Sequence, residues 1–181
     1  MTEPKPSFKR CLLAELPTLR AFGIALAGSA DRADDLVQET VMKAWRSQDR
    51  FELGTNMQAW LFIILRNTFY SQVRRRGREV PDTDGAHSSR LTVAPSHDGV
   101  LALSDLRRAL MRLPPEQREA LLLVGASGYS YGMAAEICGC AVGTIKSRVS
   151  RARAHLQVAL DEKPRRETLP RRVEAAVGAG D

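Results

Sequence analysis

The chain has 181 residues, of which 27 are Lys or Arg and 21 are Asp or Glu, so its formal net charge is +6. No segment reaches the ~18 consecutive apolar residues of a membrane span, and the opening MTEPKPSFKRC lacks the apolar core of a signal peptide. These features argue against a membrane protein, and we expect a cytoplasmic one. Basic and acidic residues cluster separately, which is typical of a protein that offers different surfaces to different partners.

Apolar residues at helical spacing predict two helices at the start of the chain. The first covers residues 8–27, with Pro17 as an expected kink or break and Gly28-Ser29 as its end. The second covers residues 31–47. Its predicted core stripe consists of Ala33, Val37, Val41 and Ala44.

The opposite face of the second helix combines acidic residues with an exposed methionine. Its members are Asp35, Gln38, Glu39, Met42 and Arg46. A protein-binding face and a merely solvated face both fit this spacing, which leaves the choice open.

A third helix, over residues 56–76, is apolar around much of its circumference, which predicts a central place in its bundle. It ends in three arginines. Aromatic rings beside arginines also suit single-stranded nucleic acid, because bases stack on rings while the backbone meets positive charge. Aromatics at this spacing are more often part of a core. We assign Phe62 and Phe69 to the core and leave open the role of Tyr70 and of the loop before the helix.

Residues 77–103 contain prolines and glycines without a sustained period, and we interpret them as a flexible linker. The predicted fold is therefore all-α, with two small helical domains at 8–76 and 104–160 and a disordered tail at 161–181. The second domain is expected to begin with Ser104 as a helix N-cap. Pro114 ends that helix, and Pro115 starts the next.

Residues 129–156, YSYGMAAEICGCAVGTIKSRVSRARAHL, predict a helix-turn-helix. Gly139 supplies the backbone freedom that the turn needs, and the second helix starts near Val142. Its inward stripe consists of Ile145, Val149, Ala152 and Leu156. The other faces carry four Lys or Arg residues and no acid, a pattern that favours a DNA-binding helix over a solvated face.

The three cysteines do not form a predicted metal site. Cys138 stands where the helix-turn-helix needs a small apolar residue, while Cys140, in the turn, is expected to be more exposed. No phosphate-binding glycine loop or set of metal-binding carboxylates is apparent. We expect no cofactor, no metal and no enzymatic activity.

Four segments, in this order, resemble extracytoplasmic-function (ECF) sigma factors of the sigma-70 family. They are DDLVQETVMKAW (34–45), AWLFIILRN (59–67), LPPEQREALLL (113–123) and GTIKSRVSRAR (143–153). Residues 62–72 further resemble the alphaproteobacterial general-stress subgroup, which is EcfG-like. The resemblance implies a subunit that binds the RNA polymerase core at its clamp and flap, directs it to promoter DNA and helps to melt it. It also implies regulation by an anti-sigma factor, NepR-like in this subgroup.

The family's functional positions carry over to matching residues of this chain. The polymerase contact maps to Asp35, Gln38, Glu39 and Met42. Contacts with the minus-ten promoter element map to the loop 50–56 and the following helix, at Arg50, Asn56, Arg66, Asn67, Tyr70, Arg74 and Arg75. Contacts with the minus-thirty-five element map to Thr144, Lys146, Ser147, Arg148 and Arg151.

The chain departs from many members of the class at three positions, Ser71, Gly132 and Met133. A glycine near the start of a helix is expected to loosen the entry to the helix-turn-helix by up to about 1 kcal/mol. Two other functions remain as alternatives: a free-standing helix-turn-helix regulator, and a sigma mimic that titrates an anti-sigma factor. The acidic face and the aromatic-basic helix argue against the first, and the retained DNA-facing arginines argue against the second.

Overall fold

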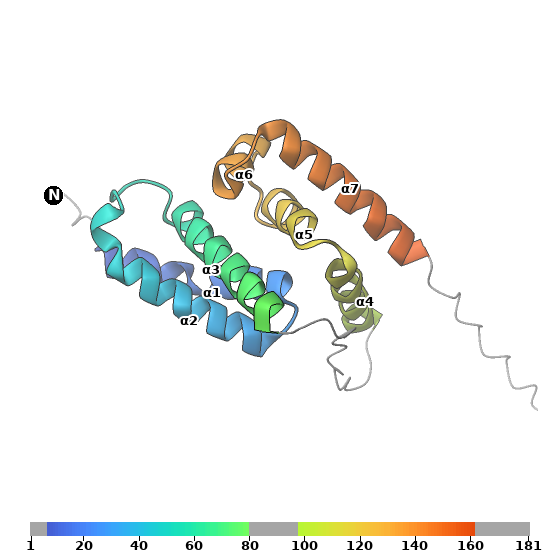
Figure 1. Ribbon diagram of the computed structural model, residues 1–181, viewed down its shortest axis with the longest axis horizontal. Helices are drawn as coiled ribbons and strands as arrows, with labels where there is room; N and C mark the ends of the chain where they lie inside the picture. The colour runs from blue at the N-terminus through green and yellow to red at the C-terminus, as the bar shows by residue number, and fades with distance from the viewer. Residues whose placement is uncertain (1–6, 80–97, 162–181) are drawn as a thin grey trace, which may run out of the picture.

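The computed structural model describes residues 7–79 and 98–161, and all regular structure within these ranges is helical (Figure 1). The N-terminal unit contains α1 (Phe8–Ala27), α2 (Ala30–Arg46), the short 3-10 helix η1 (Gln48–Arg50) and α3 (Met57–Glu79). The C-terminal unit contains α4 (Asp98–Arg112), α5 (Pro115–Leu121), the π-helical turn η2 (Leu122–Ala126), α6 (Tyr131–Cys138) and α7 (Val142–Asp161). The all-α prediction is confirmed.

The three long helices of the N-terminal unit pack against one another in pairs. Side-chain caps define where they begin: Ser7 accepts a hydrogen bond from Arg10 N, Ser29 from Arg32 N, and Asn56 from Ala59 N. Such caps satisfy backbone donors that the first helical turn leaves unpaired. At the end of α1, Gly28 adopts the left-handed conformation with φ 85°, which turns the chain directly into α2.

Pro17 does not break α1, which is continuous across it. Proline removes one hydrogen bond to the carbonyl four residues earlier, here that of Leu13. Both residues lie on the exposed side of α1, where water can bond the freed carbonyl. The expectation of a break was therefore wrong, because the lost bond faces solvent.

The core face of α2 is rotated from its predicted position. Ala33 and Ala44 are buried as expected, but their buried companions are Leu36 and Thr40, while Val37 and Val41 are only partly buried. Thr40 is accommodated because its hydroxyl donates to the carbonyl of Leu36 over 2.7 Å. A hydroxyl that bonds within its own helix can be buried without leaving a donor unsatisfied.

The expected linker boundaries fall inside helices. Helix α3 continues past 76 to Glu79, and α4 begins at Asp98, so Ser104 lies within that helix and is not its N-cap. The rest of the predicted linker, and the predicted tail after residue 161, lie outside the described residues.

The C-terminal unit is organised around α7, which packs on α4, α5 and α6. Ser130 caps α6 by accepting a hydrogen bond from Met133 N, and Gly139 ends α6 with φ 62° and ψ 42°. Helix α7 then begins at Val142, as predicted. Of its predicted stripe, Ile145, Val149 and Ala152 are buried and Leu156 is partly buried, and the helix-turn-helix is formed.

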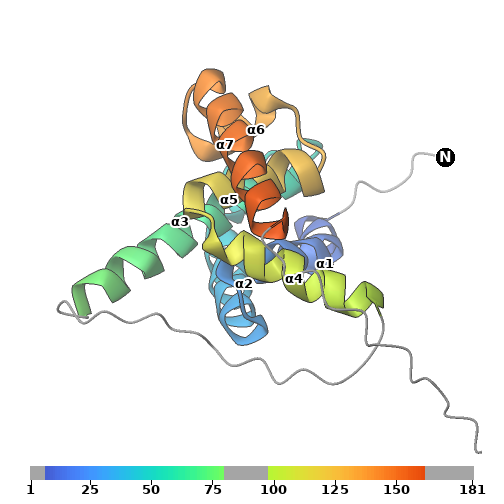
Figure 2. The same cartoon turned by 90° about the vertical axis from the view of Figure 1, so that its right-hand side faces the viewer.

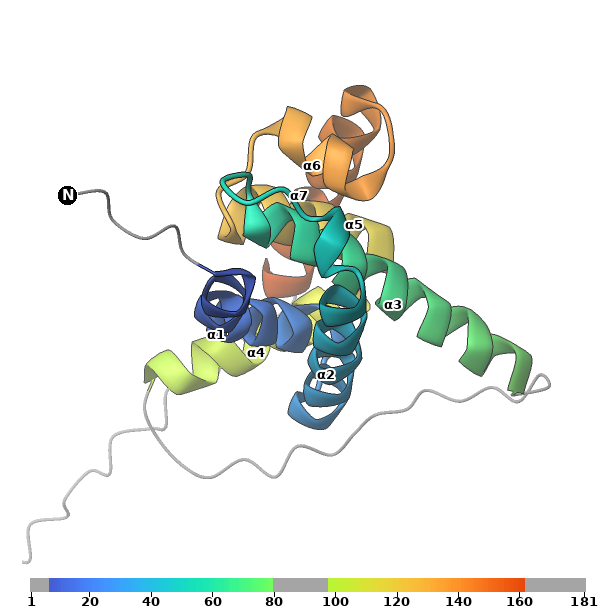
Figure 3. The ribbon, with the colours of Figure 1, turned by 90° about the vertical axis from the view of Figure 1, so that its left-hand side faces the viewer.

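The two units are docked on each other, and one hydrophobic core runs through both. Helix α3 packs on α6, and α1 packs on α5 and η2. Figures 2 and 3 show that the C-terminal part of α3 projects beyond this contact, whereas α7 lies on the far side of the molecule from α1 and α2. The packed part of α3 therefore faces the C-terminal unit, whereas the outer face of α7 faces solvent.

Candidate nucleic-acid interface

Helix α7 turns part of its predicted basic face to solvent. Lys146 and Arg151 are exposed, as is Arg153 beside them. Thr144 and Ser147 are partly buried, and the Ser147 hydroxyl donates to the Thr144 carbonyl over 2.9 Å. Between residues 142 and 160 the helix has no acidic side chain, so its outer face has an uncompensated positive charge.

Arg148 differs from the other predicted contacts on α7. Its side chain is partly buried, its Nη1 is enclosed, and its positive charge acts on the buried carboxyl of Glu119 on α5. In this arrangement Arg148 faces the interior of the molecule, so four of the five predicted minus-thirty-five residues remain on or near the outer face.

The predicted minus-ten residues of α3 divide between an exposed and an enclosed group. Asn67, Arg74 and Arg75 are exposed, and Arg74 donates to Ser71 Oγ over 3.2 Å. Arg66 and Tyr70 face the C-terminal unit, with the guanidinium of Arg66 4.9 Å from the centre of the Tyr70 ring.

Glu119 occupies the contact between the two units. Its side chain is 1% exposed, and its Oε1 lies 3.0 Å from Arg66 Nε. The Tyr70 hydroxyl donates to the other oxygen, Oε2, over 3.0 Å. Burial raises the pKa of Glu119, and the charge of Arg66, the hydrogen bond from Tyr70 and the charge of Arg148 act in the opposite direction. Burial and the carboxyl of Glu119 also raise the pKa of Tyr70 well above its ordinary value.

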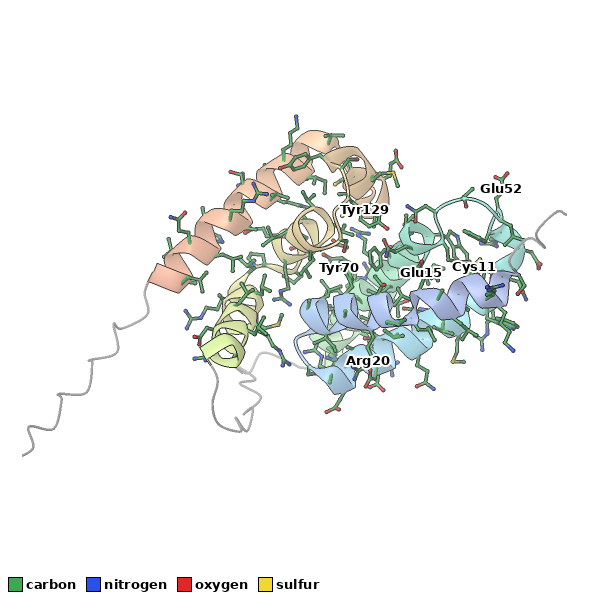
Figure 4. All side chains as sticks on the ribbon, turned by 180° about the vertical axis from the view of Figure 1, so that it is seen from behind. Cys11, Glu15, Arg20, Glu52, Tyr70 and Tyr129 are labelled. Carbon is green, nitrogen blue, oxygen red and sulfur yellow. The ribbon has the colours of Figure 1, made fainter. Side chains whose placement is uncertain are left out.

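A second polar contact between the units involves Tyr129, which precedes α6. Its hydroxyl donates to Gln58 Oε1 over 2.6 Å, and Gln58 in turn donates to Glu15 on α1 over 3.3 Å. The Tyr129 ring meets that of Phe62 edge-on with centroids 5.9 Å apart. Figure 4 shows Tyr70 and Tyr129 between the two units. Two tyrosines thus bring hydroxyl groups into the same contact from opposite sides.

The loop before α3 ends beside an aromatic cluster that we define as Phe8, Trp45, Phe51 and Trp60. The ring centroids of Phe51 and Trp60 are 5.2 Å apart, and Phe8 contacts the other three rings at about the same range, 5.9 to 6.0 Å. Of the predicted contacts here, Arg50 is exposed, and Asn56 is exposed while capping α3. The cluster fixes the start and end of the loop without covering Arg50.

The predicted polymerase face of α2 is largely solvent-exposed. Asp35 and Gln38 are exposed, and the exposed fraction of Met42 is 48%. Glu39 is engaged within the unit, since it pairs with Lys43 at 2.7 Å and accepts from Gln72 on α3 over 2.9 Å. The hydrogen bond from Lys43, followed by that from Gln72, lowers the pKa of Glu39. Glu39 therefore also helps to hold α2 on α3.

The described residues were also compared with the requirements of a metal site and of a membrane-spanning helix. Within 7–79 and 98–161 no group of three or more His, Cys, Asp or Glu residues could hold a metal ion. Cys138 is buried and Cys140 is partly exposed. No helix in the described part of the chain is both long and apolar enough to cross a membrane.

Family models match both units: "Sigma-70 region 2" matches residues 12–79, and "Sigma-70, region 4" matches residues 103–156. The chain is 56% identical to the ECF RNA polymerase sigma factor EcfG of Rhodopseudomonas palustris (strain TIE-1) over 154 residues, which is 85% of each protein. The chain is an ECF sigma factor of the sigma-70 family.

Solved structures agree with this family. The sigma factor RpoE, in its complex with the anti-sigma factor NepR from Bartonella quintana, is 57% identical with a TM-score of 0.75 over 87% of this chain and 98% of that one. A chain of the PhyRSL–NepR complex from Sphingomonas sp. Fr1 shares the fold, with a TM-score of 0.63 at 22% identity over 88% of this sigma factor and 93% of that chain.

The residues that join the two units of this sigma factor were missed by the sequence analysis. Glu119 does carry a signal, because it lies four residues before the buried Leu123 and hence on the core side of its helix. An acid on a core face requires a partner, but the sequence does not say that the partner is Arg66, 53 residues earlier in the printed numbering. Tyr129 has no comparable signal.

Proposed function

We propose that this sigma factor reads the minus-thirty-five element with α7, captures the minus-ten element with α3 and the loop before it, and binds core polymerase through α2, in a stress response. The observation that carries the proposal is the acid-free, outward face of α7 on a helix-turn-helix in which Ile145, Val149 and Ala152 of the apolar stripe are buried. Such a helix is anchored on one side and offers donors and positive charge to a DNA groove on the other.

For the minus-thirty-five element, Lys146 and Arg151 are the exposed cations, and Thr144 and Ser147 add hydroxyl groups nearby. Arginine can bind a guanine edge through two hydrogen bonds, whereas a lysine at the rim suits a phosphate. Arg148 joins this set only after its side chain turns away from Glu119.

For the minus-ten element, Arg50, Asn67, Arg74 and Arg75 present polar or charged groups at the surface. Arg66 and Tyr70 combine a cation with an aromatic ring, which is suited to an unpaired base and its phosphate. Asn56 stands at the start of the same helix, where it also serves as the cap. Together they make a single-strand surface along α3.

For polymerase, the exposed group on α2 is Asp35, Gln38 and Met42, with Glu39 at its margin. We assign this face to the polymerase clamp and the C-terminal unit to the flap. The action is that of a binding subunit without catalysis, and it takes place in the cytoplasm, where bacterial polymerase works. The pairing of RpoE with NepR supports a NepR-like anti-sigma factor as a further partner.

In vitro transcription tests this proposal. The full chain is combined with bacterial core polymerase on a library of templates with randomised upstream sequence, and the transcribed templates are sequenced. We expect selective transcription from templates that share two motifs at a fixed spacing. Absence of selective transcription, together with binding to a NepR-like protein, would contradict the proposal and favour a sigma mimic.

The same assay separates the two DNA assignments. Substituting Arg151→Ala is expected to change the upstream motif, and Asn67→Ala the downstream motif. If either variant changes the opposite motif, the assignment of its helix is wrong.

A further inference from the structure

The turn of the helix-turn-helix contains two free thiols, Cys138 and Cys140, which are separated only by Gly139. Cys138 is the last residue of α6 and belongs to the hydrophobic core, whereas Cys140 is partly exposed and packs at the edge of that core. Two neighbouring thiols have a chemistry that neither has alone, because an oxidant can join them into a disulfide. The turn therefore contains a potential site of modification.

The backbone of Gly139 sets the separation of the two cysteines. Its φ of 62° and ψ of 42° are those of a left-handed helix, the mirror image of the α-helix. The Cα atoms on either side of a residue in this conformation are about 5.4 Å apart, as they are in the α-helix itself. Disulfides join Cα atoms that are about 4.4–6.8 Å apart. The Cα atoms of Cys138 and Cys140 are thus held at a separation that a disulfide can span.

The surroundings of the two thiols determine which of them reacts first. Burial, followed by the charge of Glu119, raises the pKa of Cys138 to about 12. The positive charges of Arg66 and Arg148 act in the opposite direction, and Cys140 lies close enough to influence the same thiol. A thiol is oxidised as its thiolate and only where the oxidant has access. Cys140 is therefore the first to be oxidised, and Cys138 is the thiol that completes the disulfide.

We propose that Cys138 and Cys140 form a peroxide-sensitive pair, whose oxidation to an intramolecular disulfide reversibly disables the helix-turn-helix. The Cys140 sulfur attacks one oxygen of hydrogen peroxide, the O–O bond breaks, and a sulfenic acid and one water form. The Cys138 sulfur then attacks the sulfur of Cys140, the S–O bond breaks, and the Cys138 proton leaves with the hydroxide as a second water. The two thiols together lose two electrons, which reduce the peroxide.

The disulfide changes the connection between α6 and α7. The Cys138 side chain is 3% exposed, so its sulfur must leave the core, or draw Cys140 inward, to form the bond. Either movement disturbs the hydrogen bond of 3.1 Å from Cys140 N to the carbonyl of Ala135, just before α7 begins at Val142. A disulfide closed across one intervening residue is strained, and strained disulfides are readily reduced. The change is therefore reversible.

The loss of activity rests on the proposed role of α7 in reading the minus-thirty-five element, whereas formation of the disulfide does not. The test treats the full chain with hydrogen peroxide, removes the peroxide with catalase, and returns half of the sample to dithiothreitol. Mass spectrometry follows tryptic peptide 119–146, which contains both cysteines. Selective transcription is measured with untreated core polymerase on the library of randomised templates. The variants are Cys140→Ser, within the pair, and Cys11→Ser, a partly exposed thiol on α1 that serves as the matched control.

We expect peptide 119–146 of the oxidised chain to be lighter by two hydrogens and selective transcription to be lost, with both changes reversed by dithiothreitol. Cys11→Ser should behave like the unmodified chain, and Cys140→Ser should keep its transcription after peroxide. The proposal is overturned if the disulfide does not form, if Cys140 bonds to Cys11 or to a second chain, or if transcription is unchanged when the disulfide is present.

A second variant keeps the test decisive if serine at position 140 disturbs the turn. Cys138→Ala keeps a small apolar side chain in the core but removes the thiol that completes the disulfide. Its oxidation should stop at the sulfenic acid of Cys140, which dimedone traps, and its transcription should persist. Loss of transcription in oxidised Cys138→Ala would show that the disulfide is not the cause. If the unmodified, reduced chain does not transcribe, the proposed function fails, while the peptide mass still tests the thiol pair.

Discussion

Arg118 on α5 donates a hydrogen bond of 2.6 Å to the backbone carbonyl of Leu26 on α1. The same guanidinium also donates to the carbonyls of Leu110, Met111 and Leu113. Its exposed fraction is 8%, and burial lowers its pKa. One side chain therefore closes the end of α4 and ties the C-terminal unit to the N-terminal one.

Substituting Arg118→Met should lower the free energy of unfolding by about 2–4 kcal/mol, because several enclosed carbonyls lose their donor. Urea denaturation followed by circular dichroism measures the change. Arg112→Met, at an exposed position at the end of α4, serves as the control and should shift stability by less than about 0.5 kcal/mol. Equal effects of the two substitutions would mean that the hydrogen bonds of Arg118 are unimportant for stability.

Two glycines of the helix-turn-helix should respond oppositely to alanine. Gly132 lies in the first turn of α6, and a Cβ there would meet Ser130 Oγ at an ordinary 3.7 Å, so Gly132→Ala should stabilise by about 0.5–1 kcal/mol. Gly139 has φ 62°, a left-handed conformation that alanine adopts only with strain, so Gly139→Ala should destabilise by about 1 kcal/mol or more. Thermal denaturation of both variants gives the signs directly, and shifts of the same sign would contradict this account.

The cysteines should differ in reactivity. Burial raises the pKa of Cys138 to about 12, and only the thiolate reacts with iodoacetamide. At pH 8 the native chain should be alkylated at the partly exposed Cys11 and Cys140 well before Cys138, whereas all three should react in denaturant. Mass spectrometry of peptides after timed quenching measures the order. Modification of Cys138 at the rate of Cys140 would show that the helix-turn-helix opens readily.

Arg151 and Arg153 are both exposed on α7, but only Arg151 is assigned to the minus-thirty-five element. If Arg151 contacts a base edge, Arg151→Ala should weaken binding to the selected promoter by about 1–3 kcal/mol and relax the preference at one position. Arg153→Ala should weaken all sequences alike and reduce the dependence on salt. Competition binding against single-base variants measures both effects, and a uniform loss for Arg151→Ala would reassign it to a phosphate.

Asp35→Lys should abolish co-purification with core polymerase without changing the melting temperature, because Asp35 is exposed on the proposed clamp face. Glu39→Lys is a less clean probe, since Glu39 also holds Lys43 and Gln72. The control is Glu136→Lys, which makes the same charge change on the C-terminal unit. Retained binding by Asp35→Lys would rule out this face as the main contact.

Sequence patterns were sufficient to predict the bounds and buried faces of helices that have one dominant apolar face. Helix α1 has the predicted bounds, and α7 begins at Val142 with three of the four predicted stripe residues buried. On α2, however, the buried pair Leu36 and Thr40 lies beside the predicted pair Val37 and Val41. Apolar residues occupy both stripes of α2, so the periodicity alone does not say which stripe is buried. The packing of α2 against α1 and α3 decides it.

The relationship between the two units could not be predicted in this way. The pairs Arg66 with Glu119 and Gln58 with Tyr129 join residues that are remote in sequence, and no local period relates them. Among the residues predicted to contact DNA, Arg66, Tyr70 and Arg148 have an inward placement that the sequence did not predict. The position of a flexible Arg side chain depends on which buried acid lies nearest to it. That acid comes close only when the two units pack together.

The contact of Arg66 and Tyr70 with Glu119 has a consequence for which predicted DNA contacts are accessible in the docked arrangement. In the docked arrangement Lys146 and Arg151 on α7 are exposed, whereas the side chain of Arg66 is 22% exposed and Tyr70 is partly buried. On the proposed assignments, the docked chain offers its duplex-binding helix to DNA while part of its single-strand surface is enclosed.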